Sequence, residues 1–445
     1  MSYVDLILKK RNGLELSDSE IEAFVRGVKE GGMADYQISA MLMAIYFQGM
    51  SPREIASFTR EMALSGETLS FPSIQEPIVD KHSSGGVGDK TSLVVAPIVA
   101  ACGLPIAKLS GRGLGFTGGT IDKLESIPGF QTELSCEDFI RCVEEAGIAI
   151  IGQSANIAPV DKILYALRDV TGTVDSIPLI AGSIMSKKLA DGSDAIVLDV
   201  KYGSGAFMKT PDLAAELAKV MVGIGEDNGK KTLALVTNMD QPLGIAVGNS
   251  LEVIEAVETL QGHGPEDFVV ECRAIASAML EAGGKAKDRE EAEAMVQAVL
   301  DDGRAFEKLL DMVRCQGGDV EYIQDTSRFP KAAMVMDGLA SQEGYVEAIN
   351  TEEIGKASVL LGAGRLKLED AIDPDVGLKI YKKPGAPVKK GDRLFSVYAN
   401  DEGLGKEAVE KALSAYSLTD RALEPLTSPV YCLVKREGGE YVQER

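Results

Sequence analysis

Beyond Gly66 the chain alternates between short apolar segments and helical patterns, and this alternation constrains its fold more than any other feature. PIVDKHSS ends a short apolar run directly before a glycine-rich loop, and SLVVAPIVAACG has the pattern of a helix that follows. The scheme recurs in LPIAKLSGRGLGFTGG and in ADGSDAIVLDVKYGSGAF. Because strands that alternate with helices form βαβ units, the sequence predicts an α/β domain with a mostly parallel sheet.

A chain of 445 residues exceeds what one hydrophobic core supports, so two or three domains are expected. Helical signals include the capping box Ser17-x-x-Glu20 near the N-terminus, and Ser176 and Pro178 start another helix in a segment that interrupts the alternation. We expect these helical segments to pack together. Beyond residue 340, short strands with Pro and Gly turns predict a third unit with a hammerhead-like hairpin. The predicted domains are a small all-α domain (residues 1–66 and 160–192), a larger mixed, mostly parallel α/β domain (75–155 and 193–335) and a C-terminal α+β module (340–445).

Charge and cysteine content exclude several classes of function. The net charge is −22, which argues against nucleic acids and anionic membrane surfaces as partners because both require a basic face. The 6 cysteines form no C-x-x-C pair and the chain has only 2 histidines, so a zinc site is not expected. Scattered cysteines, an N-terminus unlike a signal peptide and no apolar run of about 18 residues predict a cytoplasmic protein that does not span a membrane.

The first glycine-rich loop, DKHSSGGVGDKTS at residues 80–92, combines glycines with side chains that bind anions. Its Lys-Thr ending suggests a P-loop, but Ser84 and Asp89 stand where that motif needs glycine. The glycines allow successive N–H groups to turn inward as an anion nest, next to the N-terminus of a helix. A flexible turn is the structural alternative, but the flanking donors favour phosphate or another anion. These donors are Lys81, Ser83 and Ser92.

The second glycine-rich loop, AKLSGRGLGFTGGTIDK at residues 107–123, has more glycines than a structural turn needs. It lacks the dinucleotide fingerprint, because Phe116 replaces the third glycine of G-x-G-x-x-G. Since both loops follow strands, we expect them to meet at the carboxyl ends of the sheet, where α/β proteins bind ligands. The donors in this loop are Lys108, Ser110 and Thr120.

The helical insert carries a third group of polar residues. Ser183 and Lys187 are four residues apart and share a helix face, and Arg168 precedes them on the previous helix. A solvated surface is the alternative, but an Arg, Ser and Lys set suits a planar ligand with carbonyl oxygens and a ring N–H. His82 lies inside the first glycine-rich loop, and histidine changes protonation near neutral pH, so it is the candidate catalytic residue.

These motifs together resemble the thymidine and pyrimidine-nucleoside phosphorylase family over essentially the whole chain. The most specific pieces are DKHSSGGVGDKTS, SGRGLGFTGGTIDKLESIPGF, RDVTGTVDSIPLIAGSIMSKKLADG and DVKYGSGAFM. The resemblance implies a helical domain that faces the α/β domain across a cleft. It also implies a homodimer formed through the helical domains, which would give the apolar helix at residues 38–48 a partner surface.

The resemblance implies reversible phosphorolysis of pyrimidine nucleosides such as uridine, thymidine and deoxyuridine, which yields the free base and a pentose 1-phosphate. Phosphate would bind on the α/β side and the pyrimidine on the helical side. A protonated His82 would stabilise the leaving base together with Arg168 and Lys187. Position by position, the phosphate ligands match Lys81, Ser83, Ser92, Ser110 and Thr120; the polar pyrimidine ligands match Arg168, Ser183 and Lys187; and the apolar pocket walls match Leu114, Tyr165 and Phe207.

Within the family, Lys108 resembles the branch that accepts both uridine and thymidine. That branch implies a potassium-like cation between the loops, with ligands that match Gly88, Leu243, Ala246 and Glu255, and with Lys90 at the position of a further ligand that is usually Thr. The backbone carbonyl of Lys90 would preserve the cation site, whereas its ammonium, turned inward, would replace the ion. Phe116 stands where the family usually has His, which is expected to alter contacts on the sugar side.

Three alternatives remain open from the sequence. A thymidine-specific phosphorylase would use the same site. A phosphoribosyltransferase of related fold would need acidic magnesium ligands, for which Asp175, Asp191 and Asp194 in or near the helical insert are the candidates. A catalytically silent nucleoside-binding protein would be favoured if His82, Arg168 or Lys187 were replaced, and all three are present.

Overall fold

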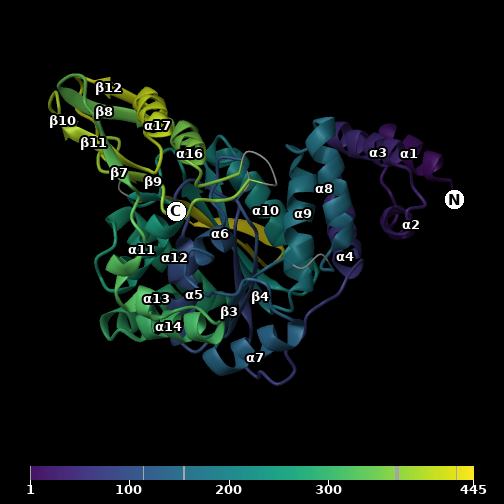
Figure 1. The fold of residues 1–445 in the computed structure, drawn as a ribbon. Helices are drawn as coiled ribbons and strands as arrows, with labels where there is room; N and C mark the ends of the chain where they lie inside the picture. Colours follow the sequence, from purple (N-terminus) through teal and green to yellow (C-terminus); the bar gives the residue numbers. More distant parts are fainter. Residues whose placement is uncertain (1, 114, 154–155, 366–369, 427, 445) are drawn as a thin grey trace.

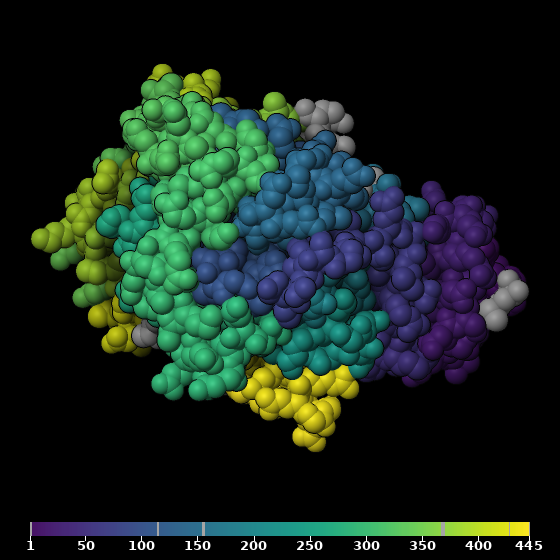
Figure 2. All heavy atoms as spheres, turned by 90° about the horizontal axis from the view of Figure 1, so that it is seen from below, coloured from purple at the N-terminus to yellow at the C-terminus, as the bar shows by residue number. Residues whose placement is uncertain are grey.

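The computed structural model describes residues 2–113, 115–153, 156–365, 370–426 and 428–444 (Figure 1). Its architecture is the predicted one: an all-α domain, an α/β domain and a smaller β-rich module. In Figure 2 the N-terminal helices project at one end of the molecule, away from the C-terminal module. No helix within the described ranges combines the length and apolar character needed to cross a bilayer.

The N-terminal helices pack with the helical insert, as expected. Their common core includes Phe24, Phe58, Leu164 and Leu179, which come from both segments. A buried ion pair between Lys10 and Glu54, with 2.8 Å between Nζ and Oε1, fixes the first helix on the fourth. The helices of this domain are α1 (Tyr3–Arg11), α2 (Asp18–Lys29), α3 (Asp35–Gln48), α4 (Pro52–Leu64), α8 (Pro159–Thr171) and α9 (Ile177–Ala190).

The central sheet has the order β1-β4-β5-β13-β14. The first three strands are parallel, and β13 and β14 continue the sheet in antiparallel fashion. The parallel pair β2-β3 lies beside β1, where Val79 N donates to Pro105 O. The strands are β1 (Val79–Ser83), β2 (Ile106–Ser110), β3 (Ile148–Gly152), β4 (Ala195–Tyr202), β5 (Lys231–Asn238), β13 (Val430–Glu437) and β14 (Glu440–Glu444). Both glycine-rich loops therefore leave the carboxyl ends of neighbouring strands, as predicted.

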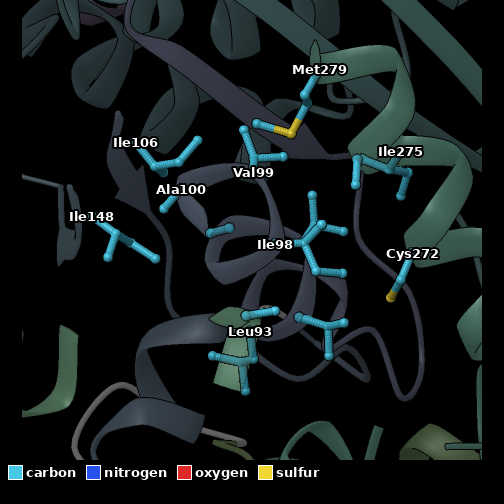
Figure 3. Close-up of a cluster of buried hydrophobic side chains, with 14 of the residues drawn as sticks. Leu93, Ile98, Val99, Ala100, Ile106, Ile148, Cys272, Ile275 and Met279 are labelled. Carbon is cyan, nitrogen blue, oxygen red and sulfur yellow. The ribbon is translucent and has the colours of Figure 1, made fainter. Parts of the chain in front are cut away.

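The helix after the first glycine-rich loop, α5 (Thr91–Ala101), is buried along almost its whole length. Figure 3 shows Ile98 and Val99 of this helix close to Ile275 and Met279 of another helix, α12. A helix enclosed by other elements needs apolar residues on all sides, which explains its sequence SLVVAPIVAA. The remaining helices of the α/β domain are α6 (Thr120–Leu124), α7 (Cys136–Ala146), α10 (Pro211–Asp227), α11 (Asn249–Leu260), α12 (Glu266–Ala282), α13 (Arg289–Asp301), α14 (Arg304–Cys315) and α15 (Glu321–Gln324).

The C-terminal module contains two small sheets, ordered β6-β9-β11-β7 and β10-β8-β12, with two helices packed against them (Figure 1). Its elements are β6 (Ala246–Gly248), β7 (Met334–Leu339), β8 (Gly344–Ile349), β9 (Gly377–Ile380), β10 (Pro387–Val388), β11 (Arg393–Ala399), β12 (Tyr416–Thr419), α16 (Thr351–Leu360) and α17 (Glu402–Ser414).

The assignment of SPVYCLVKREGGEYV to this module was wrong. Strand β13 pairs with β5 in the central sheet, with Leu433 opposite Leu235, and buries Cys432 and Val434 there. Without β13, the β5 edge would present unpaired backbone groups and apolar side chains to solvent, and pairing removes both costs. The predicted module of residues 340–445 therefore loses its last two strands to the α/β domain.

Candidate active site

A cavity of about 190 Å³ lies between the helical domain and the carboxyl end of the central sheet. Apolar side chains form most of its wall, and polar groups enter from both domains. Sequence reasoning had assigned five of its residues to a nucleoside site: His82, Tyr165, Arg168, Ser183 and Phe207. Ser84, Val174, Asp175, Ile180, Ile184, Met208 and Leu217 complete it, and the sequence had not singled out the apolar members of this set for the site.

Arg168 is held rigidly at the end of α8. Its guanidinium donates to the carbonyl oxygens of Val174 at 2.6 Å, Leu179 at 3.0 Å and Thr173 at 3.3 Å, and lies over the ring of Tyr165. Burial lowers the pKa of Arg168, yet its ordinary pKa is so high that it stays charged. The carbonyls leave spare N–H donors and fix their direction, so the side chain is preorganised for a ligand oxygen.

Lys187 is less directly engaged with the cavity. Its ammonium forms an ion pair with Asp161 of α8 and lies 3.3 Å from the hydroxyl of Ser183, which does line the cavity. Lys187 therefore reaches the cavity through Ser183 in this structure. A modest rotation of its long side chain would exchange Asp161 for a ligand.

The surroundings of His82 favour its neutral form. Burial lowers its pKa well below the ordinary value, and the positive charges of Lys188, Lys108 and Lys187 lower it further, against the opposing effect of Asp80. A negatively charged ligand at the adjacent loop would act in the other direction and raise the pKa of His82. A bound anion would therefore favour the protonated form expected from the family resemblance.

The donors predicted in the first loop are held by internal partners. The ammonium of Lys81 donates to Thr91 and lies 3.3 Å from Asp199, and the hydroxyl of Ser83 donates to Asp89. The pKa of Asp89 lies well below its ordinary value: although burial opposes it, Lys201, Lys81 and Lys123 stabilise the carboxylate. Ser92 lies in the first turn of α5, so the loop and the helix N-terminus stand together as predicted. The positive φ angles of Gly85 and Gly88, +95° and +73°, provide the sharp turns.

The donors of the second loop are more widely spread. Lys108 points toward β1, where its ammonium donates to the carbonyl of Lys81, and burial together with neighbouring lysines lowers its pKa to about 8. Thr120 is the first residue of α6. Ser110 lines another cavity, of about 610 Å³, so it and His82 face different spaces in this structure. Leu114, the remaining predicted wall residue, lies outside the described residues.

Phe116 contacts the C-terminal module. It packs against the apolar core of the C-terminal module, and its carbonyl lies so close to Gly355 of α16 that a Cβ there would clash with it. The C-terminal module therefore packs against the second glycine-rich loop and supports it. An aromatic ring at this position is explained by that packing.

A network of buried charges beneath the site was not predicted. Lys188 of α9 pairs with Asp80 of β1 and with Asp191 at 3.1 Å, and Lys201 of β4 contacts Asp199 at 2.9 Å and Glu271 of α12 at 2.6 Å. Charged residues inside the apolar strand runs VDKHS and AIVLDVKY were the available signal, because a charge in a buried strand must be paired. The network joins the helical domain to the sheet directly under His82.

The oxygen ligands that the resemblance implied for potassium surround the side chain of Lys90 in this structure. The ammonium of Lys90 lies among them, 2.7 Å from Leu243 O and 3.0 Å from Ala246 O, and forms an ion pair with Glu255. Gly88 turns against the same carbonyls. Across the described residues, no group of three or more His, Cys, Asp and Glu side chains is arranged to hold a metal ion.

Comparison with known proteins agrees with this geometry. The sequence profile described as "Glycosyl transferase family, a/b domain" matches residues 75–306, and "Glycosyl transferase family, helical bundle domain" matches residues 4–66. Residues 345–419 match "Pyrimidine nucleoside phosphorylase C-terminal domain". Among solved structures, anthranilate phosphoribosyltransferase from Thermus thermophilus is similar, with a TM-score of 0.58 and 22% identity over 70% of this chain and 99% of that one. At that identity the similarity shows the fold.

Curated relatives are much closer in sequence. The pyrimidine-nucleoside phosphorylase of Bacillus subtilis (strain 168) is 52% identical over 425 residues, which are 96% of this chain and 98% of the relative. The enzyme of the same name from Geobacillus stearothermophilus is 51% identical over 402 residues, or 90% of this chain and 93% of the relative. The family resemblance inferred from the motifs is therefore confirmed, and the chain belongs to the pyrimidine-nucleoside phosphorylase family.

Proposed function

We propose that this chain catalyses the reversible phosphorolysis of pyrimidine nucleosides. The observation that carries the proposal is the cavity between the two domains, in which His82 of the sheet faces Arg168 and Ser183 of the helical domain. Family membership at 52% identity supports the same activity. A pyrimidine suits the cavity because its flat ring fits apolar walls while its carbonyl oxygens and ring N–H need the few polar groups that converge there.

In the proposed reaction a phosphate oxygen attacks C1′ of the sugar as the bond from C1′ to the pyrimidine nitrogen breaks. The bonding electrons leave with the pyrimidine, and a proton taken up by the base completes the products, free pyrimidine and (deoxy)ribose 1-phosphate. Negative charge on the departing ring is stabilised by Arg168, whose direction is fixed by backbone carbonyls, and by Lys187. Preorganised donors stabilise charge that develops in the transition state more than charge already present in the substrate.

Phosphate is proposed to bind at the first glycine-rich loop and the N-terminus of α5, with donors Lys81, Ser83, Ser92, Ser110 and Thr120. The ligand would take over hydrogen bonds that Thr91 and Asp89 now make with Lys81 and Ser83. Its charge would raise the pKa of His82, so the same event that loads phosphate would protonate the catalytic residue. Ser110 lines a separate cavity in this structure and is the proposed donor at the end of β2, beside the first loop.

The rival phosphoribosyltransferase activity is disfavoured by the acidic residues themselves. Asp191 is fully buried and paired with Lys188, and burial raises its pKa to about 6 despite the lysine. Asp194 accepts a hydrogen bond from the backbone of Ile78. Both carboxylates are thus committed to structural partners, and of the three candidates only Asp175 lines the cavity, which leaves a single carboxylate for a magnesium diphosphate site.

The proposed assembly is a homodimer formed through the helical domains. Tyr36 and Phe47 of α3 are 77% and 75% exposed, and Val4 and Leu8 of the adjacent α1 are also exposed. Aromatic and apolar side chains on neighbouring helices form a surface that a second copy would cover. A cytoplasmic location is proposed on the buried free thiols Cys102, Cys142 and Cys272.

Side-by-side turnover tests the proposal and ranks its substrates. Uridine, thymidine and deoxyuridine are each supplied with phosphate, and release of free base is measured by chromatography. Release from all three supports the broad-specificity branch suggested by Lys108, whereas release from thymidine and deoxyuridine alone supports the thymidine-specific alternative. No release from any of them would overturn the proposed function.

A further inference from the structure

Lys90 belongs to the first glycine-rich loop, yet the proposed reaction assigns it no contact with either substrate. It is the N-cap residue of α5, and its side chain is fully buried. Its ammonium has three oxygen partners: Leu243 O at 2.7 Å, Ala246 O at 3.0 Å and the carboxylate of Glu255. A buried ammonium is very costly without such partners, so this arrangement is a specific binding site for one positive charge.

Two further residues, Phe268 and Gly244, enclose the Lys90 ammonium. The ring of Phe268 lies 5.1 Å from Nζ and adds a cation–π contact. Gly244 has a φ of +68°, and a Cβ at that position would lie 2.8 Å from Nζ and still closer to the Glu255 carboxylate. The chain therefore needs glycine where the segment 243–246 wraps around the charge.

Two carbonyls and a carboxylate also form a suitable ligand set for a monovalent metal cation. A potassium ion bound to these same oxygens would have to occupy the position of the Lys90 ammonium. Potassium and the Lys90 ammonium each carry one positive charge, so either cation can neutralise the Glu255 carboxylate. We propose that Lys90 is a built-in monovalent cation that replaces a free potassium ion and holds the phosphate loop in place.

The contacts around Glu255 show what the charge holds together. The Glu255 carboxylate accepts hydrogen bonds from Ile245 N at 2.9 Å and Ala246 N at 3.1 Å, and Leu243 N donates to Val87 O at 3.1 Å. Lys90 thus ties the segment 243–246 and α11 to the loop that carries Lys81 and Ser83. Loss of the charge leaves the Glu255 carboxylate buried without its cation and loosens this loop.

A tethered charge differs from a free ion in its response to salt. A free ion stabilises the folded protein by an amount that grows with the logarithm of its concentration above its dissociation constant, whereas an ammonium bonded to the chain is present in every buffer. The wild-type protein should therefore unfold at the same temperature in potassium, sodium and choline chlorides of equal ionic strength. The expected response of the unfolding temperature to salt does not depend on the proposed function. Only the expected change in phosphate KM rests on the proposed function.

The test compares wild type with Lys90→Thr, which removes the ammonium and leaves space and a hydroxyl. Lys287→Thr is the matched control, because Lys287 is 76% exposed and lines none of the described cavities.

Thermal midpoints of unfolding are measured in choline chloride as potassium replaces choline at constant ionic strength. We expect no potassium-specific change for wild type and the control. For Lys90→Thr we expect a lower midpoint in choline and a saturable rise with potassium. Its phosphate KM in choline should be on the order of tenfold higher and recover with potassium.

Crystals soaked in thallium(I), which resembles potassium, reveal a bound monovalent cation without any measurement of enzyme activity. Anomalous density between Leu243 O, Ala246 O and Glu255 is expected in Lys90→Thr and not in wild type. A saturable potassium effect on the wild-type midpoint, thallium at this position in wild type, or a folded Lys90→Thr variant indifferent to potassium would each overturn the inference. If Lys90→Thr does not fold without potassium, wild-type midpoints and thallium density alone decide. A chain that releases no base, yet shows the expected midpoints, contradicts the proposed function and leaves the inference standing.

Discussion

Buried lysines dominate the electrostatics around the candidate site, and each has a carboxylate partner far away in the sequence. Lys201 pairs with Glu271, Lys123 with Glu252 and Lys90 with Glu255. The sequence located Lys90 in the loop and left two orientations of its side chain open. Only the structure distinguishes them, because the partner lies 165 residues further along the chain (255 − 90). Side-chain pairing across such separations has no local signal.

Replacement of His82 tests the proposed catalytic residue. His82→Ala should lower kcat by about 100-fold or more, because a positioned acid or base typically contributes that much. The phosphate KM should change by less than about threefold, since Lys81 and Ser83 remain in the loop. Steady-state kinetics on uridine measure both. His263→Ala is the control, because His263 is exposed and outside the site. An unchanged kcat in His82→Ala would remove the catalytic role.

Element by element, the sequence predicted most of the scaffold. The capping box at Ser17 begins α2 at the expected position, and the all-apolar pattern after the first loop forms the buried helix α5. The prediction was wrong for β13, whose sheet is decided by the strand it pairs with. The residues of β13 have the pattern of a strand in the C-terminal module, yet β13 pairs with β5 in the central sheet. A strand's own residues specify that it is a strand, and not which edge it joins.

The contact between β4 and α12 carries a pH-dependent stability. Burial, opposed by Lys201 and reinforced by Asp199, raises the pKa of Glu271 to about 8. The folded protein therefore binds more protons than the unfolded chain between the ordinary Glu pKa and about 8, and its free energy of unfolding falls as pH rises through this window. Glu271→Gln cannot ionise and should lose less stability over the same window, by on the order of 3 kcal/mol.

Urea unfolding at about pH 5 and about pH 9 measures this difference. Glu266→Gln on the same helix is the control, because Glu266 is exposed and should retain the wild-type pH dependence. Parallel pH dependence of wild type and Glu271→Gln would show that Glu271 ionises normally in the folded protein.

In the whole molecule, the site depends on the helical domain and the α/β domain together, and these two domains share apolar cores. The cavity takes His82 and Ser84 from the sheet and Arg168 and Ser183 from the helical domain. The ion pair between Lys188 and Asp80 connects these domains beneath it. The sequence predicted both domains and their polar residues, but the cavity shape and the packing of the C-terminal module against Phe116 required the three-dimensional structure.

The exposed face of α1 and α3 predicts the assembly of the whole molecule. A charge in the middle of an apolar contact is strongly unfavourable, so Phe47→Glu should convert the proposed dimer into a monomer. Sedimentation equilibrium measures the change. Leu404→Glu, at an exposed position on α17 of the C-terminal module, should leave the dimer intact. A wild-type protein that is already monomeric would contradict the proposed interface.

Transfer of a pentose from a pyrimidine to phosphate is tested by following both products together. Uridine is incubated with the protein at increasing phosphate concentrations, with uracil followed by absorbance and the phosphate ester by phosphorus NMR. We expect uracil and ribose 1-phosphate to form in equal amounts, neither product to form without phosphate, and uridine to be regenerated when both products are added. Uracil release that is independent of phosphate, or that yields free ribose, would contradict this transfer.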